Sequence, residues 1–234
     1  MKIPTKKLKS GFEIPVYGLG TWRMGGGLAR DPNNNDKADI RAIKYAIDSG
    51  ITHIDTAEAY ANGHAEKLVS KAIKGYSRKK LFIVSKVYST NLRHDDLLRS
   101  AEGSLKRLNT DYLDLYLIHA PNPDVPPKET MRALDKLMDR SLIKNIGVSN
   151  FTIKNLEKAQ SYTSYKIVTN QVDYSLNYRE PKEIGLLNYC QNNDIVLTAY
   201  RPLAVGKLAN DKSKALDKMA KKYNKTCAQI ALIG

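Results

Sequence analysis

The chain alternates between short apolar runs and longer stretches in which apolar residues recur every three or four positions. Short apolar runs between polar segments are typical of buried strands, and the longer period is typical of helices buried on one face. After an opening hairpin with its turn at Ser10 and Gly11, strands are predicted at 16–20, 51–55, 81–86, 112–119, 144–149, 167–172 and 195–200. Helices are predicted between an N-cap at Asn35 or Asp36 and Gly50, at 65–74 and 95–108, from Pro127, after a Thr152 cap, and at 181–192, 212–223 and 227–233.

These elements form a repeated unit of one strand followed by one helix. The predicted strands end at residues spaced 22 to 34 positions apart: Thr21, Asp55, Lys86, His119, Ser149, Gln171 and Tyr200. Nearly continuous apolar strands separated by amphipathic helices indicate a parallel sheet that helices cover. Such a run favours a (β/α)8 TIM-type barrel, with a doubly wound sheet as the alternative. The sequence has no linker, so a single domain over residues 1–234 is expected.

The repeat contains seven strands, so we expect the eighth strand and last helix of such a barrel to be missing. The first and seventh strands would then have unpaired backbone edges, which proteins rarely leave bare. Another segment or another chain is expected to cover the gap, for example by self-association.

Charge and composition narrow the classes of function. The net charge of +14 attracts anions in general, but the lysines are spread along the chain and no nucleic-acid recognition motif is present. The longest apolar runs are far shorter than a membrane span, and the N-terminus lacks the apolar core of a secretory signal. We therefore expect a cytoplasmic protein that binds neither nucleic acid nor membrane. Cys190 and Cys227 have no metal-binding spacing, so no metal site is expected.

Four polar residues that could take part in catalysis lie at the ends of three predicted strands. Asp55 follows a strand, and Tyr60 lies five residues later in a small, polar segment. Lys86 and His119 each end an apolar column, because alternate strand residues point to the same face. Each residue also has a simpler interpretation, as a capped turn with a surface tyrosine, a surface lysine or a structural histidine. Active sites of such barrels lie at the carboxyl ends of the strands, where all four residues would meet.

Together these four groups would form a proton donor for a carbonyl. A phenol has a pKa of about 10, and a neighbouring ammonium favours the phenolate and lowers that pKa. Lys86 is predicted to act in this way on Tyr60, and Asp55 would keep Lys86 charged and oriented. His119 would donate to the oxygen on which negative charge develops. The hydride must come from a cofactor, and Ser149, Asn150, Gln171 and the Tyr200 ring are suited to an amide-bearing ring.

The chain resembles the aldo-keto reductases over nearly its whole length. The matching segments, in family order, are Gly18-Leu-Gly-Thr-Trp22, Ile54-Asp-Thr-Ala-Glu-Ala-Tyr60, Ser85-Lys86, Asp114-Leu-Tyr-Leu-Ile-His119, Gly147-Val-Ser-Asn-Phe151, Asn170-Gln171 and Tyr200-Arg-Pro-Leu203. The resemblance implies a TIM barrel that binds NADPH without a Rossmann domain and reduces aldehydes and ketones to alcohols.

The resemblance also implies a role for each matching residue. Tyr60 resembles the proton donor, Lys86 and Asp55 the groups that tune it, and His119 the group that orients the carbonyl. The implied cofactor contacts are Gly20, Thr21, Ser149, Asn150, Gln171, Tyr200, Arg201 and Leu203, with Tyr200 stacking on nicotinamide. Trp22 resembles a wall of the substrate pocket.

Two features depart from the family pattern. Arg201 stands where relatives commonly have a small hydroxyl residue, and an arginine can instead pair with a cofactor phosphate. The family segment that binds the adenosine 2′-phosphate follows the eighth strand, so none of its contacts can be assigned to a residue, and NADH is an alternative cofactor. We therefore expect weak or absent turnover. A cofactor-binding or regulatory relative is the alternative function.

Overall fold

The structure, a computed structural model, describes residues 3–210 and 214–233. Seven strands lie in one sheet in the chain order β3-β4-β5-β6-β7-β8-β9, and every pairing from β3 to β7 is parallel. This is the (β/α)8 fold with seven of its eight strands among the described residues. It confirms the predicted fold class and rejects the doubly wound alternative, in which the strands would not follow chain order.

The backbone divides into two compact units, residues 1–169 and 170–234, with the boundary inside strand β8 (Ile167–Asp173). The expectation of a single domain over residues 1–234 stays a prediction.

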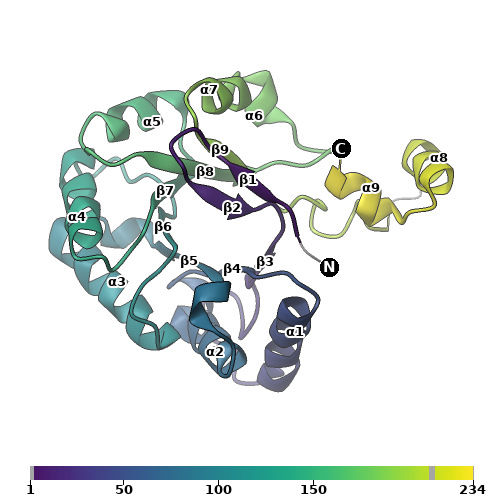
Figure 1. Ribbon diagram of the computed structural model, residues 1–234, viewed down its shortest axis with the longest axis horizontal. Helices are drawn as coiled ribbons and strands as arrows, with labels where there is room; N and C mark the ends of the chain where they lie inside the picture. The colour runs from purple at the N-terminus through teal and green to yellow at the C-terminus, as the bar shows by residue number, and fades with distance from the viewer. Residues whose placement is uncertain (1–2, 211–213, 234) are drawn as a thin grey trace. The chain divides into compact units, whose positions relative to one another are not determined.

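The first unit contains five complete strand–helix repeats. Its parallel strands are β3 (Gly18–Gly20), β4 (His53–Asp55), β5 (Phe82–Val87), β6 (Leu115–Ile118) and β7 (Ile146–Ser149). Its α-helices are α1 (Asp36–Asp48), α2 (His64–Ile73), α3 (His94–Leu108), α4 (Pro127–Asp139) and α5 (Ile153–Gln160). Three short 3₁₀ turns, η1 (Tyr60–Gly63), η2 (Arg78–Lys80) and η3 (Ser89–Asn91), lie in the connections. Helices α1 to α4 lie outside strands β4 to β7 (Figure 1).

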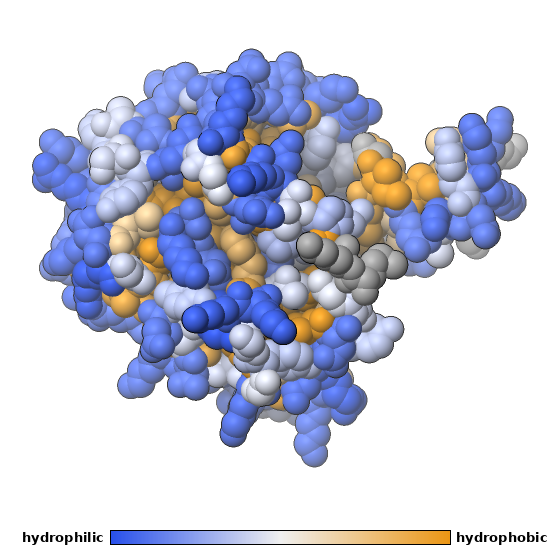
Figure 2. Space-filling view, in the orientation of Figure 1, coloured by the Kyte–Doolittle hydropathy of each residue, from blue (hydrophilic) through white to orange (hydrophobic). Residues whose placement is uncertain are grey.

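Local sequence explains where these helices begin and which face they bury. The Asn35 side chain accepts a hydrogen bond from the Ala38 amide at the start of α1, and Thr152 does the same for Asn155 at the start of α5, so both predicted caps are confirmed. Figure 2 shows hydrophilic residues on the outward sides of α1 to α4 and apolar residues toward the strands. The first unit therefore buries its helices' apolar faces on the sheet.

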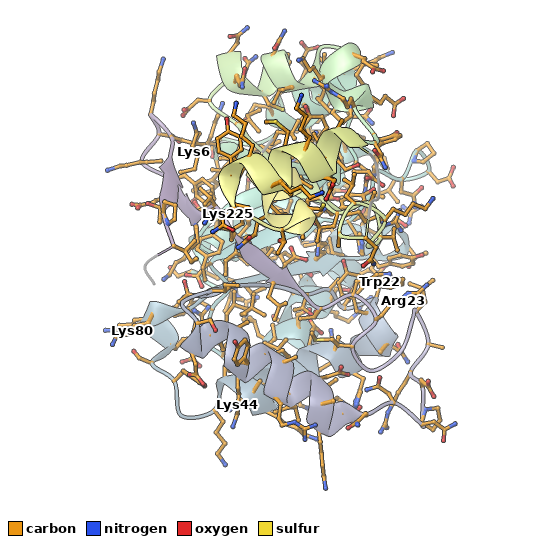
Figure 3. The ribbon with its side chains drawn as sticks, turned by 90° about the vertical axis from the view of Figure 1, so that its right-hand side faces the viewer. Lys6, Trp22, Arg23, Lys44, Lys80 and Lys225 are labelled. Atoms are coloured by element: carbon orange, nitrogen blue, oxygen red, sulfur yellow. The ribbon has the colours of Figure 1, made fainter. Side chains whose placement is uncertain are left out.

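The N-terminal hairpin closes the amino end of the strands. Strands β1 (Thr5–Lys7) and β2 (Glu13–Pro15) are antiparallel, and Gly11 has a φ of 91° in the predicted turn. The Phe12 ring contacts Phe82, the first residue of β5, with ring centroids 6.2 Å apart. Figure 3 shows Lys6 of this hairpin on one side of the molecule and Trp22, which follows β3, on the opposite side. The hairpin therefore lies on the side of the molecule away from Trp22.

The second unit contains the end of β8, α6 (Glu180–Glu183), α7 (Leu186–Asn192), β9 (Val196–Tyr200), α8 (Lys214–Tyr223) and α9 (Cys227–Ile233). The prediction of one continuous helix over 181–192 is wrong. Gly185 has a φ of 78°, which a right-handed helix does not accommodate, and the segment is therefore divided into α6 and α7. Of the predicted helix over 212–223, residues 212 and 213 lie outside the described residues.

Helices α8 and α9 pack around a small apolar cluster within the second unit, formed by Leu208, Leu216 and Ala231. Across residues 3–210 and 214–233, no helix combines the length and the apolar content that crossing a bilayer requires.

Candidate active site

A fully buried lysine is the centre of the candidate site in the first unit. The Lys86 ammonium donates to Asp55 Oδ1 at 2.5 Å, to the Thr56 carbonyl at 2.9 Å and to the Tyr60 hydroxyl at 3.2 Å. Burial alone would lower the pKa of Lys86, but the Asp55 carboxylate and the Tyr60 hydroxyl outweigh burial, and the pKa is raised. Lys86 is therefore a charged ammonium with three oxygen partners, rather than a surface residue.

Strand register brings Asp55 and Lys86 together. On the paired strands β4 and β5, Asp55 lies opposite Val84, and alternation then places Lys86 on the same face one pair further along. On the other side of β4, Gly20 pairs with Asp55, and both the amide and the hydroxyl of Thr21 donate to the Asp55 carbonyl, at 2.9 Å and 3.1 Å. In this structure Gly20 and Thr21 hold the backbone of Asp55, and their predicted cofactor contacts stay predictions.

Tyr60 lies on a turn with an unusual backbone. Ala61, Asn62 and Gly63 all have positive φ values, of 49°, 51° and 77°, a left-handed region that glycine adopts freely, asparagine tolerates and alanine rarely enters. Two backbone bonds hold the turn, from the Ala61 amide to the Gly27 carbonyl at 2.7 Å and from the Asn62 amide to the Leu28 carbonyl at 2.8 Å. The loop after β3 therefore fixes the segment that carries the phenol.

Two rings, those of Trp22 and His119, meet the Tyr60 ring. The Trp22 ring meets the Tyr60 ring edge-on with centroids 5.1 Å apart, and Trp22 keeps 41% of its surface exposed. The His119 ring meets Tyr60 at 5.6 Å and Tyr88 at 5.9 Å, both edge-on. Trp22, Tyr60, Tyr88 and His119 thus form a half-open aromatic wall, in which Trp22 faces solvent as a pocket wall would.

His119 is held in its neutral form. Burial, together with the nearby Lys86 charge, lowers the pKa of His119 to about 4. Its Nδ1 is buried and has no hydrogen-bond partner among the described residues. A neutral ring with its proton on Nε2 leaves Nδ1 unprotonated, which avoids a buried N–H without an acceptor. His119 can therefore present an uncharged donor.

Two polar residues at the end of β7 lie beside His119. Ser149 is buried, and the Asn150 amide nitrogen donates to the Ser149 hydroxyl and to the His119 carbonyl, both at 3.0 Å. Asn150 has a φ of 62°, in the left-handed region that asparagine tolerates better than most residues. The structure thus brings two of the three predicted carboxamide contacts next to His119.

The remaining predicted cofactor residues lie in the second unit. Gln171 is buried on β8, and Tyr200 is half-buried at the end of β9. The exposed Arg201 guanidinium pairs with Asp173 Oδ2 at 3.4 Å, and Leu203 packs against the apolar cluster beside α8 and α9. Within this unit, Arg201 is thus a cation at the end of a strand with one weak carboxylate partner.

The sequence alone did not single out three further groups at the site: Thr56, Tyr88 and Glu58. Thr56 acts through its backbone carbonyl, for which the residue type carries no signal. Glu58 accepts from the Tyr88 amide at 2.7 Å and from the Asn91 side chain at 3.0 Å, which fixes the loop after β5. The position of Tyr88, two residues beyond Lys86 at a strand exit, is a signal that could have found it.

The arrangement matches a known family. Residues 17–232 match the model of the aldo/keto reductase family. The chain belongs to this family. The aldo-keto reductase match spans every residue of the Lys86 cluster and the predicted cofactor residues.

Individual relatives agree with this assignment. The chain is 39% identical to the methylglyoxal reductase YeaE of Escherichia coli over 94% of its own length and 76% of that protein. It is 38% identical to the glyoxal reductase of Bacillus subtilis over 97% of its length and 77% of that protein.

Solved structures of aldo-keto reductases have the same fold. The thermostable Tm1743, solved with the inhibitor epalrestat, superposes with a TM-score of 0.92 at 48% identity, covering 97% of this chain and 83% of that one. The Klebsiella pneumoniae enzyme, solved with NADP and acetate, has a TM-score of 0.86 at 36% identity, covering 99% of this chain and 80% of that one. Family membership makes this aldo-keto reductase an oxidoreductase.

Proposed function

We propose that this aldo-keto reductase reduces small aldehydes or ketones to alcohols, with Tyr60 as the proton donor and NADPH as the cofactor. The observation that carries the proposal is the hydrogen-bonded series from Asp55 through the buried Lys86 ammonium to the Tyr60 hydroxyl, at 2.5 Å and 3.2 Å.

In this proposal each group of the first unit has one task. The Lys86 ammonium beside the Tyr60 hydroxyl favours the phenolate that remains after the proton has left. Asp55 and the Thr56 carbonyl keep that ammonium charged and in place. The neutral His119 donates from Nε2 to the carbonyl oxygen as negative charge develops on it. The proton then passes from the Tyr60 hydroxyl to that oxygen and completes the alcohol.

The chain's donor set fits a nicotinamide cofactor. The Ser149 hydroxyl and the Asn150 amide are suited to a carboxamide, and both lie against the His119 backbone. The other proposed cofactor contacts, which the family resemblance implies, are Gln171, Tyr200, Arg201 and Leu203. When bound, NADPH supplies the hydride that adds to the carbonyl carbon. Two structures of aldo-keto reductase from Klebsiella pneumoniae were solved with NADP and with NADPH, which supports NADPH over NADH as the cofactor.

The proposed substrates are small, reactive aldehydes. Relatives named methylglyoxal reductase and glyoxal reductase share 39% and 38% identity with this chain. The aromatic wall of Trp22, Tyr60 and Tyr88 beside His119 would contact a compact carbonyl compound from several sides.

The test compares Tyr60→Phe with Tyr45→Phe, the same substitution at an exposed position of α1. Oxidation of NADPH is measured with methylglyoxal and glyoxal. Because a positioned general acid contributes roughly 10² to 10⁴ to rate, Tyr60→Phe should lower kcat by about that factor. The Tyr45→Phe variant should match the wild type, and NADPH binding, followed by cofactor fluorescence, should survive in both variants.

Three results would count against the proposal in different ways. An active Tyr60→Phe variant would refute Tyr60 as the donor. A wild type that binds NADPH but reduces no aldehyde would favour the alternative of a cofactor-binding or regulatory relative. A wild type that binds no NADPH would overturn the cofactor assignment.

A further inference from the structure

A second buried charge lies behind the catalytic strand and takes no part in the chemistry above. Glu66 of α2 is fully buried, and each of its carboxylate oxygens has one partner. The Ser85 hydroxyl donates to Oε1 at 2.6 Å, and the Arg107 Nε of α3 donates to Oε2 at 2.5 Å. A carboxylate is stable in such a place only when it is paired, so this cluster links β5, α2 and α3.

One arm of the cluster reaches the catalytic lysine. Ser85 immediately precedes Lys86 on β5, and side chains on a strand alternate between its two faces. Lys86 points to Asp55 and Tyr60, and Ser85 points the opposite way, to the helices and Glu66. The bond from Ser85 to Glu66 therefore anchors the backbone from which Lys86 extends.

The other arm reaches the turn that carries Tyr60. Arg107 packs directly on Gly63, the last residue of η1, so that a Cβ at Gly63 would come within 2.7 Å of the Arg107 Cδ and Nε atoms. The Arg107 guanidinium also donates to the Ser104 hydroxyl at 3.2 Å, which steadies the side chain on α3. The two preceding residues, Ala61 and Asn62, are left-handed, and such a turn persists only where its surroundings hold it.

We propose that Glu66 and Arg107 are positioning residues that set the distance between the Lys86 ammonium and the Tyr60 hydroxyl. Glu66 links the two segments that carry Lys86 and Tyr60. One of its carboxylate oxygens bonds to Ser85 on the strand of Lys86, and the other bonds to Arg107, which packs on the turn of Tyr60. Neither residue touches the substrate. The inference rests on the proposed function, since the 3.2 Å contact that it explains is the one through which the proton donor would work.

The main test is Glu66→Gln, which keeps the shape of the side chain and removes the charge that pairs with Arg107. A misplacement of about 1 Å in an active site can cost about a hundredfold in rate, so kcat should fall by about tenfold to a hundredfold. KM for the aldehyde and the Kd for NADPH should change little. The pH at which kcat is half-maximal should also rise. A Lys86 ammonium that lies further from the Tyr60 hydroxyl stabilises the phenolate less, so it lowers the pKa of Tyr60 less.

The matched control is Glu102→Gln, the same substitution on α3 in the exposed ion pair between Glu102 and Arg140 at 2.9 Å. It should leave kcat and its pH profile at the wild-type values. Ser85→Ala removes only one hydrogen bond, so it extends the test if Glu66→Gln folds poorly, and it should lower kcat in the same direction.

A second readout needs no turnover. Hydrogen exchange of the Ala61 and Asn62 amides, which bond to Gly27 and Leu28, reports local opening of the turn. In Glu66→Gln these amides should exchange about tenfold faster or more relative to core amides of β6, and in Glu102→Gln they should not.

The outcomes separate the two proposals. An inactive wild type would overturn the proposed function, and the exchange experiment would still decide whether Glu66 holds the turn. An active wild type with unchanged kcat, pH profile and exchange in Glu66→Gln would overturn only the positioning role. A Glu66→Gln variant that loses stability but keeps its kcat would show that Glu66 has only a structural role, and this result would also overturn the positioning role.

Discussion

Asp55→Asn is the substitution that tests the electrostatics of the site most directly. It removes the carboxylate 2.5 Å from the fully buried Lys86 ammonium and keeps nearly the same shape. The acceptors left to the ammonium, which are the Thr56 carbonyl, the Tyr60 hydroxyl and the new amide oxygen, would all be uncharged. We expect the variant to lose stability because a buried charge is left without its counter-charge.

The magnitude can be reached in two ways. Breaking a buried ion pair by removing one partner costs roughly 3 to 5 kcal/mol. Alternatively, the lysine sheds its proton, which at pH 7 costs about 4.6 kcal/mol for a reference pKa of about 10.4, at 1.36 kcal/mol per pH unit. Because the lysine can deprotonate, the loss of folding free energy cannot exceed about 4.6 kcal/mol, which lies within the range of roughly 3 to 5 kcal/mol for a broken ion pair. For a chain of this length, roughly 3 to 5 kcal/mol corresponds to a fall in Tm of about 6 to 20 °C.

The pH dependence identifies the cause. In the wild type the pKa of Lys86 is raised, so its stabilisation is complete below pH 10.4 or so and is lost as the pH rises through the folded-state pKa. In Asp55→Asn the pKa should fall below its unfolded value, so the free energy of unfolding should rise with pH up to about 10.4. At pH 9 the cost of deprotonation is only about 2 kcal/mol, so the gap between the two proteins should narrow.

The assay is urea denaturation of both proteins at pH 7 and pH 9, with Asp96→Asn as the control. Asp96 forms an exposed pair with Arg99, and its loss should change stability little at either pH. Adding Lys86→Met to Asp55→Asn should recover most of the lost stability, because neither charge is then buried. A gap of equal size at pH 7 and pH 9 would refute the reasoning, since it would show that the lysine charge is not the source of the loss.

Two further predictions concern the cofactor and the histidine. Arg201→Ala should weaken NADPH binding by about tenfold or more, which is what one charge-assisted hydrogen bond to phosphate contributes. The control is Arg179→Ala, which should bind NADPH as the wild type does. Equal Kd values for Arg201→Ala and the wild type in fluorescence titrations would contradict this prediction. Because burial lowers the pKa of His119 to about 4, the unfolded chain binds more protons between that pH and about 6.5, and stability should fall in this window as the pH drops. Between pH 7 and pH 5, the free energy of unfolding from urea denaturation should fall by about 2 kcal/mol less in His119→Gln than in the wild type. An equal fall in both proteins would show that His119 is not a source of the acid sensitivity.

The repeat of apolar and polar positions predicted the order of the elements because strand and helix periods are local properties of a chain. The strands end within a few residues of the predicted positions, and the caps at Asn35 and Thr152 act as expected. The break at Gly185 was missed, since a single glycine is compatible with a helix until its φ is known.

The sequence also predicted which residues share the carboxyl ends of the strands, because parallel strands in a barrel all point the same way. It left open whether Lys86 is a surface residue. Burial of Lys86 and its 2.5 Å contact with Asp55 depend on the register between β4 and β5, which no single strand encodes.

Contacts between distant segments were decided only by the tertiary structure. Glu66 meets Ser85 and Arg107 because α2 and α3 pack behind β5, and the left-handed turn after Tyr60 exists because two loop carbonyls and the Arg107 side chain hold it. Sequence periodicity therefore determined the elements and the residue types at the site. Packing determined the distances on which the proposed proton transfer depends. A distance between side chains requires the relative placement of two elements, and periodicity describes only one element at a time.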